Sequence, residues 1–472
     1  MPSLADPGRN TVLAGRAQVM APALELYLEL HRDPELSGSE RRTAARLAEA
    51  LTRAGCDVTT GVGGHGVVGV LPNGPGPTVL LRAELDALPV EERTGLAYAS
   101  RVTAPGPDGA PVPVMHACGH DLHTAALAGT ARLLADARDA WRGTLVLVGQ
   151  PAEETLTGAH AMLRDGLYDR FPVPDVALAQ HVAPFPAGCV AHGTGPMTAY
   201  GTTLETVLHG RGGHAAMAHL TVNAVEIAAE AVLGIKKWAA AQRPDGTGRV
   251  TVVPGALHAG VRANVVPERA RLSIGLRGLS PDRVDEAVTA VREILREVSR
   301  AAGSPLDPEV TAAPGAVLNV NSPGPARSVR AGHEELLGTR QVLDWPPSLA
   351  AEDFPLYGRA GAGVHGRPAV PTVYWMVGSV GPEQWRRAPG TTVPEKLATL
   401  PPNHSCGYAP DPVPTLRTAI TALSGAALTF LTPEARTPRA RRQEGCQRSA
   451  SETEPPPPVP PGITGTGTSP PM

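Results

Sequence analysis

Two short apolar segments, TVLLRAEL at residues 78–85 and GTLVLVGQ at residues 143–150, most constrain the fold of this chain. Each has the length of a strand and few polar residues, as expected for a strand that is buried on both faces. A helix is predicted between them, at about residues 122–140, from its apolar periodicity. Strands that alternate with helices predict an α/β fold with a covered, largely parallel sheet.

A further helix is predicted at residues 40–54, where apolar residues recur on one face. Ser37 and Glu40 stand before it at the spacing of a capping box, and Gly55 follows it as a C-terminal stop. These signals predict that both ends of the helix are capped by residues that are its neighbours in the sequence.

The pattern changes after about residue 198, where an apolar–polar alternation replaces the continuous apolar runs. The predicted elements are strand, helix, strand, strand, helix and strand, at residues 202–210, 222–241, 249–257, 269–277, 280 onward and 309–314. This order is the ferredoxin-like plan. We therefore expect residues 198–307 to form a small domain inserted into a larger one, made of residues 1–197 and 308–432. Residues 433–472 are rich in Pro, Ser, Thr and Gly, and we expect a disordered tail there.

The composition narrows the class of protein. The 472 residues are enough for two or more domains, and the net charge of −3 gives no electrostatic case for binding nucleic acid or a membrane. We find no signal-peptide pattern at the start and no run of about 18 apolar residues that would span a bilayer. The five cysteines are odd in number and widely spaced, so no disulfide framework is predicted. We therefore expect a cytoplasmic location in which cysteines stay reduced.

Residues 115–125, MHACGHDLHTA, concentrate side chains that bind metals. Cys118 and His120 are candidate ligands, although a structural zinc site needs four ligands and this stretch alone is also compatible with chance. A helix that continues after Asp121 directs His123 towards packing or solvent. We do not expect His116 or His123 to be ligands.

Other candidates for metal binding and acid–base chemistry are spread along the chain. Glu153 and Glu154 follow a predicted strand, at the kind of strand end where α/β enzymes build their sites. One carboxylate of such a pair can bind a metal while its neighbour accepts a proton from water. His181 ends an apolar run just before a predicted loop, and His404 lies in a Pro-rich loop. Each of these alone is also a common kind of surface residue.

Taken together, these stretches resemble the M20 metallopeptidase family, in particular the amidohydrolase branch of N-acyl-amino-acid, hippurate and auxin-conjugate hydrolases. The matching segments span about residues 20–430 and are RAELDALP, MHACGHDLHTA, QPAEE, QHVAP, GRGGHAAMAHLTVNAV, RANVVPERARLSIGLR, AAEDFPLYG, YWMVGS and NHSCGYAPDP. The resemblance implies an α/β fold of two domains: a mixed-sheet catalytic domain like that of zinc peptidases, and an inserted ferredoxin-like lid. The lid is also implied to form the interface of a homodimer.

The resemblance further implies two divalent metal ions per subunit, Mn²⁺ or Zn²⁺, with Co²⁺ or Ni²⁺ as alternatives. Cys118 would bridge the two ions. His120 and His181 would bind one of them, and Glu154 and His404 would bind the other. A thiolate bridge suits zinc, but the ligand types do not decide the metal.

The remaining implied roles concern the reaction, which would be hydrolysis of the amide bond of an N-acyl amino acid or related small conjugate. Glu153 resembles the general base that takes a proton from a metal-activated water. Asp86 would orient the ligands. His214, in the inserted domain, would stabilise the oxyanion. Asn264, in the same domain, would contact the substrate.

Three positions depart from the family pattern. Glu84 stands where aspartate is usual, Ala218 replaces a usual proline, and Cys406 stands where proline is common. None of these removes a ligand or the base. The alternative functions are a catalytically silent small-ligand-binding homologue, a small-peptide (dipeptide-type) metallopeptidase, and a thiol enzyme with Cys118 as its nucleophile.

Overall fold

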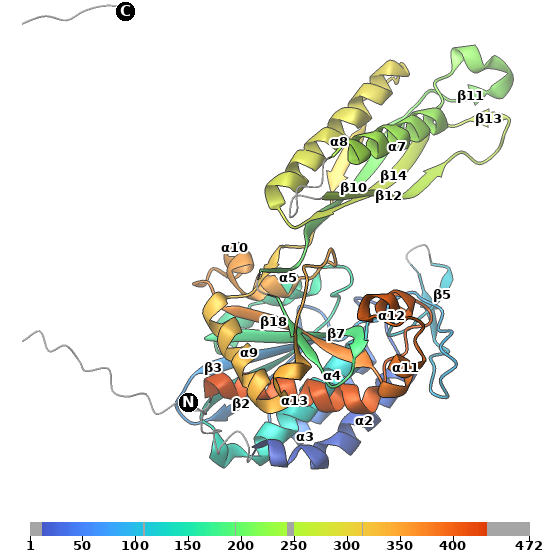
Figure 1. The fold of residues 1–472 in the computed structure, drawn as a ribbon. Coiled ribbons are helices and arrows are strands. Elements are labelled where there is room, and N and C mark those ends of the chain that lie inside the picture. The colour runs from blue at the N-terminus through green and yellow to red at the C-terminus, as the bar shows by residue number, and fades with distance from the viewer. Residues whose placement is uncertain (1–11, 107–108, 194, 243–249, 314, 432–472) are drawn as a thin grey trace, which may run out of the picture. The chain divides into compact units, whose positions relative to one another are not determined.

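The computed structural model is a mixed α/β structure with a large mixed sheet, which confirms the α/β part of the predicted fold class (Figure 1). It describes residues 12–106, 109–193, 195–242, 250–313 and 315–431. The predicted disordered tail lies outside the described residues. Among the described residues, no helix is long and apolar enough to cross a membrane.

The larger sheet has eight strands and is mixed rather than largely parallel. Their order is β1 (Asp57–Val62), β2 (Gly66–Asn73), β6 (Gly143–Gln150), β3 (Thr78–Glu84), β7 (Val176–Pro186), β18 (Thr372–Val380), β8 (Val190–His192) and β17 (Val342–Asp344). β3 runs parallel to β6 and β7, and β18 runs parallel to β7, whereas β2 is antiparallel to both of its neighbours. The two apolar segments therefore form adjacent parallel strands, β3 and β6.

Helices cover both faces of this sheet, and each face has its own apolar core. The first core is packed by α2 (Arg16–Arg32), α3 (Arg41–Arg53), α4 (His120–Asp136), α9 (Pro323–Leu337) and α13 (Pro412–Leu431). The second core is packed by α5 (Gly158–Arg164), α6 (Leu167–Arg170) and the short helix η5 (Phe354–Tyr357). Successive residues of β3 point to opposite faces: Val79 and Leu81 belong to the first core and Leu80 to the second.

A separate four-stranded antiparallel sheet has the order β12-β14-β10-β15. Along the chain its elements are β10 (Tyr200–His209), α7 (Ala224–Ala241), β12 (Val250–Ala259), β14 (Arg269–Gly278), α8 (Pro281–Ala301) and β15 (Glu309–Ala312). The two helices and the sheet share a third apolar core, in which Ile227 of α7 and Val291 of α8 are fully buried. β15 pairs with β10 although it lies beyond residue 307.

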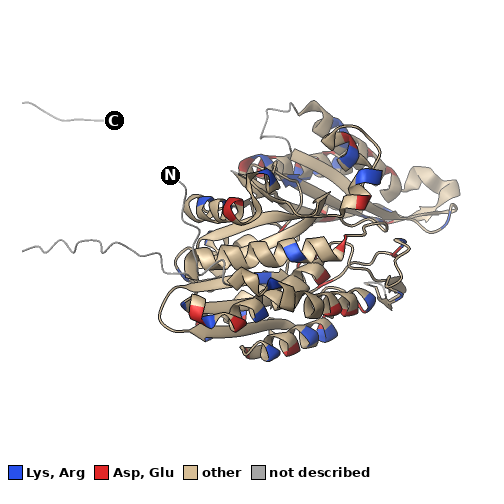
Figure 2. Cartoon of the chain, turned by 60° about the horizontal axis from the view of Figure 1, so that its bottom comes forward, with Lys and Arg blue, Asp and Glu red and all other residues tan. Residues whose placement is uncertain are grey.

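Smaller elements complete the chain. They are β4 (Thr103–Pro105), β5 (Pro111–Pro113), η1 (Arg138–Ala140), β9 (Pro196–Thr198), β11 (Gly213–His214), η2 (Ala215–Leu220), β13 (Val265–Val266), β16 (Asn319–Val320), η4 (Thr339–Gln341), η6 (Arg359–Gly361), α10 (Ala362–His365), α11 (Pro382–Arg387) and α12 (Val393–Thr399). Basic and acidic residues are interspersed along the exposed helices (Figure 2). They form pairs such as Arg53–Glu49 at 2.6 Å on α3 and Arg132–Asp136 at 2.8 Å on α4.

The predicted capping box before α3 is wrong. Glu40 is itself the N-cap residue of α3, and its side chain makes no cap hydrogen bond. Ser37 Oγ donates instead to Asp86 Oδ2, at 2.7 Å. Glu40 Oε1 accepts the N–H groups of Gly38 and Ala152, so neither side chain forms the predicted pair of bonds.

Two element boundaries also differ from the sequence prediction. β7 does not end at His181 but continues to Pro186, because its pairing with β18 extends that far. α4 begins at His120 rather than near residue 122. His120 is therefore a helix residue, and its backbone is fixed by the first turn of α4.

Candidate metal centre

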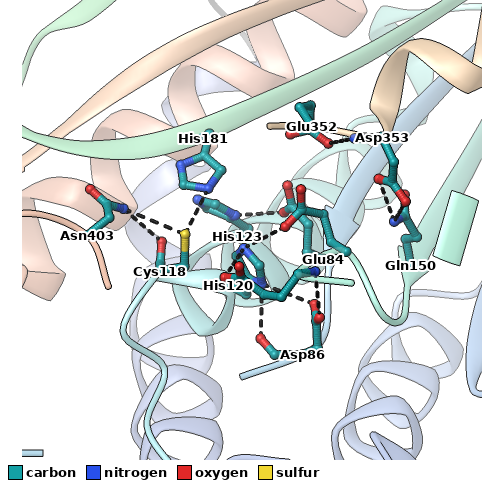
Figure 3. Close-up of polar contacts among 12 residues, drawn as sticks. Glu84, Asp86, Cys118, His120, His123, Gln150, His181, Glu352, Asp353 and Asn403 are labelled. Atoms are coloured by element: carbon teal, nitrogen blue, oxygen red, sulfur yellow. Dashed lines mark hydrogen bonds and ion pairs between the residues drawn. The ribbon is translucent and has the colours of Figure 1, made fainter. Parts of the chain in front are cut away.

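Five segments that are far apart in the sequence meet at one end of the larger sheet (Figure 3). They are the carboxyl ends of β3 and β6, the first turn of α4, the middle of β7 and the loop before α13. The loop before α13 reaches the site because His404 N donates to Ala117 O at 2.8 Å. This arrangement brings the five candidate metal ligands together.

The donor atoms of these ligands have the separations that a shared metal site requires. Cys118 Sγ lies 3.3 Å from His181 Nε2 and 3.3 Å from His404 Nε2. Glu154 Oε2 lies 3.4 Å from His404 Nε2, and Glu154 Oε1 lies 3.8 Å from His120 Nε2. Two ligands that each lie about 2.1 Å from one tetrahedral ion are about 3.4 Å apart. The observed distances therefore fit divalent ions held between these atoms.

The hydrogen bonds of two histidines direct their Nε2 atoms towards the centre. His181 Nδ1 donates to Val182 O at 2.8 Å, and His120 Nδ1 donates to Asp86 O at 2.9 Å. A proton fixed on Nδ1 leaves Nε2 free to bind a metal. His120 Nε2 and Glu154 Oε1 are buried and have no hydrogen-bond partner among the residues that the structure describes. Such unpartnered buried atoms are costly unless a ligand completes the site.

Asp86 interacts with two of the candidate ligands, His120 and Glu154. Its Oδ1 lies 3.2 Å from His120 Nδ1, and its Oδ2 accepts the Glu154 backbone N–H at 2.9 Å. Burial raises the pKa of Asp86, but the hydrogen bond and charge of His120 outweigh it and leave the pKa below its usual value. Asp86 is therefore a charged group that holds His120 and the backbone of Glu154 in place.

The acidic surroundings of the site favour a cation. Burial lowers the pKa of His120, but Asp86 and Glu84 more than compensate and raise it to about 10. Burial, Glu154 and Glu153 together raise the pKa of the Cys118 thiol well above its usual value. A divalent cation would displace both protons on binding. A raised thiol pKa disfavours the thiolate that a thiol enzyme would need.

Glu153 lies next to the candidate ligands, in a buried group with Glu352 and Asp353. Its Oε2 is 3.8 Å from His120 Nε2, and its side chain is almost fully buried. Burial raises its pKa well above the usual value, and the nearby carboxylates Glu352 and Glu154 raise it further. A raised pKa makes the Glu153 carboxylate a stronger proton acceptor than an ordinary glutamate.

The sequence analysis missed a buried polar cluster next to Glu153. The Arg82 guanidinium forms ion pairs with Glu84, with Glu352 at 2.8 Å and with Asp353 at 2.9 Å. The segment AAEDFPLYG belongs to the resemblance, but no role was assigned to its two acids. The available signal was Arg82 inside an apolar strand, since a buried arginine requires carboxylate partners.

Asn403 was also missed. Its Nδ2 donates to Cys118 O and to Val182 O, both at 3.2 Å, and so connects the loop of His404 to two other ligand-bearing segments. His404 has a φ of 68°. Backbone strain of this kind, held by tertiary contacts, is common at functional sites.

The two histidines not expected to be ligands have other environments. His123 Nδ1 donates to Glu84 Oε2 at 2.7 Å, and its Nε2 accepts the Val182 N–H at 2.9 Å, so both of its nitrogens are occupied. It is buried and does not face solvent. His116 is also buried, and burial lowers its pKa to about 4, which keeps it neutral.

His214 and Asn264 are not brought to this centre. A cavity of about 530 Å³ is lined by Cys118, Glu153 and His404 among others, but by neither of these two residues. They lie together at the small antiparallel sheet of β11 and β13, where Ala215 N donates to Asn264 O at 3.2 Å. His214 is exposed, and its Nδ1 accepts the Ala216 N–H at 3.0 Å, so that Nε2 carries the proton.

An α/β fold with thiol, imidazole and carboxylate groups around one point, beside a carboxylate of raised pKa, has the donor types that metal-dependent hydrolases use. The sequence profile of peptidase family M20/M25/M40 matches residues 80–390. Thermostable carboxypeptidase 2 of Saccharolobus solfataricus is 30% identical over 398 residues, which are 82% of this chain and 90% of that protein. N-acetyl-L-cysteine deacetylase of Bacillus subtilis is 30% identical over 370 residues, covering 78% and 82%. Hippurate hydrolase of Campylobacter jejuni is 30% identical over 329 residues, covering 69% and 82%.

A solved structure shares the fold. The Bacillus subtilis YXEP protein, a dinuclear metal-binding peptidase from the M20 family, matches with a TM-score of 0.63 at 22% identity, covering 87% of this chain and 99% of that chain. The chain belongs to the M20 peptidase family, as its motifs predicted, and is a hydrolase that acts on amide bonds.

Proposed function

We propose that this enzyme hydrolyses the amide bond of N-acyl amino acids or related small conjugates, by means of water activated by two divalent metal ions. The observation that carries the proposal is that five candidate ligands lie close together: Cys118, His120, Glu154, His181 and His404. Two of their buried atoms, His120 Nε2 and Glu154 Oε1, have no hydrogen-bond partner among the described residues. The names of the N-acetyl-L-cysteine deacetylase and hippurate hydrolase relatives support the substrate class. The dinuclear site of the YXEP protein supports the number of ions.

The five ligands divide into two sets around Cys118. Its Sγ is equally distant from His181 and His404, which suits a thiolate shared by two ions. His120 completes the set of His181, and Glu154 completes the set of His404. When bound, Mn²⁺ or Zn²⁺ would supply a Lewis acid that lowers the pKa of water.

Glu153 would move the proton. Its carboxylate would accept a proton from the attacking water and deliver it to the leaving amine. The buried, acidic surroundings of Glu153 raise its pKa, which allows it to hold the proton between these steps. The Arg82 cluster would keep the neighbouring carboxylates in fixed positions.

The inserted residues 198–307 would form a ferredoxin-like lid through which two subunits dimerise, and residues 1–197 and 308–432 would form the catalytic domain. His214 is exposed and carries its proton on Nε2, as a donor to a developing oxyanion must. In this proposal His214 and Asn264 serve the site of the partner subunit, because they do not line the cavity of their own chain.

The test is a panel of N-acetyl, N-benzoyl and other N-acyl amino acids. Each would be assayed after exhaustive chelation and again after addition of Zn²⁺, Mn²⁺, Co²⁺ or Ni²⁺. We expect activity to disappear with chelation and to return with at least one metal. Glu153→Gln, the matched control, should bind metal like wild type while kcat falls by about 10²- to 10⁴-fold, because only the proton acceptor is lost.

Full activity after chelation would contradict the proposal. Loss of metal in Glu153→Gln would mean that Glu153 and Glu154 have exchanged roles. The panel also includes dipeptides, because the similarity to a carboxypeptidase favours a small-peptide metallopeptidase as the second candidate. Activity confined to dipeptides would assign the protein to that group.

A further inference from the structure

The side chain of Glu40 reaches from the start of α3 to the loop that carries the acid pair Glu153 and Glu154. Glu40 is fully buried. Its Oε1 accepts the Gly38 N–H at 2.7 Å and the Ala152 N–H at 2.8 Å. This carboxyl therefore links two segments that are 112 residues apart in the sequence.

Ala152, the partner of Glu40, stands immediately before the acid pair and has an unusual backbone. Its φ is 50°, a left-handed conformation that costs free energy for any residue with a Cβ. Its carbonyl accepts the N–H groups of Thr157 and Gly158, which closes a tight turn around the pair. Such a conformation persists only where the surroundings hold it, and Glu40 supplies the partner of the Ala152 N–H.

We propose that Glu40 is a positioning residue for this hydrolase: it fixes the turn at Ala152 and thereby the carboxylate of Glu153. The inference rests on the proposed function, in which Glu153 transfers the proton. Ser37, in the same short turn, donates to Asp86, which orients His120. The segment from Ser37 to Glu40 thus supports both the base and a ligand.

The loss of Glu40 should affect Glu153 more than the metal site. The Glu154 N–H has its own acceptor, Asp86 Oδ2, and does not depend on Glu40. Removing the Glu40 carboxyl should therefore displace the turn at Ala152 while Glu154 stays in place. The expected signature is a lower kcat with an unchanged KM and unchanged metal content, since a small misplacement of a catalytic group is costly.

Glutamine is a conservative replacement for Glu40. Burial raises the pKa of Glu40 to about 7, and the charge of Asp86 adds to this effect. A neutral carboxyl accepts hydrogen bonds through its carbonyl oxygen, and the glutamine side chain has the same acceptor. Glu40→Gln should therefore preserve the bond to Ala152 that Glu40→Ala removes.

The matched control is Glu35→Ala. Glu35 is another buried carboxylate of the same segment, and it accepts the Thr43 N–H at 2.8 Å and the Thr43 hydroxyl at 3.1 Å. No hydrogen bond joins its side chain to the turn at Ala152 in the described part of the chain. Glu35→Ala should lower the melting temperature and leave kcat within about threefold of wild type.

The experiment measures kcat, KM and metal content of the metal-loaded full-length chain. We expect Glu40→Ala to lower kcat about 10- to 100-fold at unchanged KM, with Glu40→Gln within about threefold of wild type. The double variant Glu40→Ala/Glu153→Gln should be no slower than Glu153→Gln alone, because Glu40 acts through Glu153. The proposal is overturned if Glu40→Ala keeps the kcat of Glu35→Ala, or if its effect multiplies with that of Glu153→Gln.

Hydrogen exchange gives a readout that does not need activity. The backbone amides of residues 150–158 should exchange faster in Glu40→Ala than in wild type, and no faster in Glu35→Ala. Equal exchange in the two variants overturns the positioning role. If the wild type hydrolyses nothing on the panel, the proposed function fails, while exchange still decides whether Glu40 holds the turn.

Discussion

Buried ionisable side chains in this protein pair with one another, and His31 is the clearest case outside the candidate metal centre. Its Nδ1 lies 2.7 Å from Asp121 Oδ2, and its Nε2 lies 3.2 Å from Glu92 Oε1. Burial lowers the pKa of His31, but the hydrogen bonds of the two carboxylates outweigh it and raise the pKa to about 9. His31 is therefore protonated at neutral pH, and its ion pairs with Asp121 and Glu92 stabilise the folded state.

This shift predicts how stability depends on pH. The folded pKa of His31 exceeds its unfolded value of about 6.5, so its contribution is complete below pH 6.5 and is lost as pH rises through 9. The loss should reach up to about 3 kcal/mol. Urea unfolding at pH 6 and pH 9.5 measures it. In His31→Gln, the free energy of unfolding should fall less between pH 6 and pH 9.5 than in wild type. An equally steep fall in the variant would contradict the raised pKa of His31.

At the scale of elements, α4 holds the candidate ligand His120 in place because of how the helix begins and what it packs against. Gly119 precedes it with a φ of 83°, and a Cβ there would lie 2.4 Å from Val182 Cγ2. Only glycine fits between Cys118 and His120 at this turn. Further along, α4 approaches α13 at Gly129, where a Cβ would lie 2.6 Å from Ile420 Cδ1.

This close approach gives a test of the α4–α13 packing. Gly129→Ala should destabilise the protein by about 1–3 kcal/mol, because the new methyl group overpacks the interface. Ile420→Val removes the Cδ1 atom that the new methyl group at position 129 would contact first. The double variant should therefore be less destabilised than the sum of the two single variants in urea unfolding, whereas simple additivity would show that the helices move apart instead. Gly324→Ala, in open space on α9, is the control and should not be destabilising.

At the scale of the whole molecule, the four-stranded sheet presents apolar side chains to solvent. β12 lies at one edge of this sheet, and its Val253 and Leu257 are 52% and 43% exposed, while Leu233 of α7 is 64% exposed. An unpaired edge strand with exposed apolar residues is suited to pairing with another chain. This surface supports the proposal of a homodimer.

A shared active site follows from the dimer proposal and can be tested by mixing. Glu153→Gln and His214→Ala should each be inactive. When their subunits exchange at equal concentration, about half of the dimers become mixed, and one site in each combines an intact Glu153 with an intact His214 from across the interface. About a quarter of all sites should regain activity. Mixed dimers that form without activity above the parents would place His214 in the site of its own chain.

Features that depend on neighbouring residues could be predicted from the sequence. The apolar runs of β3 and β6 specify buried strands, because burial on both faces requires apolar side chains at every position. Glu153 and Glu154 were recognised from their position after such a strand. The family followed from motifs that are each continuous in the sequence.

The contacts between distant segments could not be predicted from the sequence, because they depend on how the chain packs. Glu40 has capping-box spacing in the sequence, yet its carboxyl bonds to Ala152, and Asn403 bonds to Cys118 across 285 residues. The mixed direction of the sheet and the full length of β7 were decided by strand pairing in the same way. A buried polar group takes whichever partner the packed chain brings within hydrogen-bond distance, and local spacing does not encode that choice.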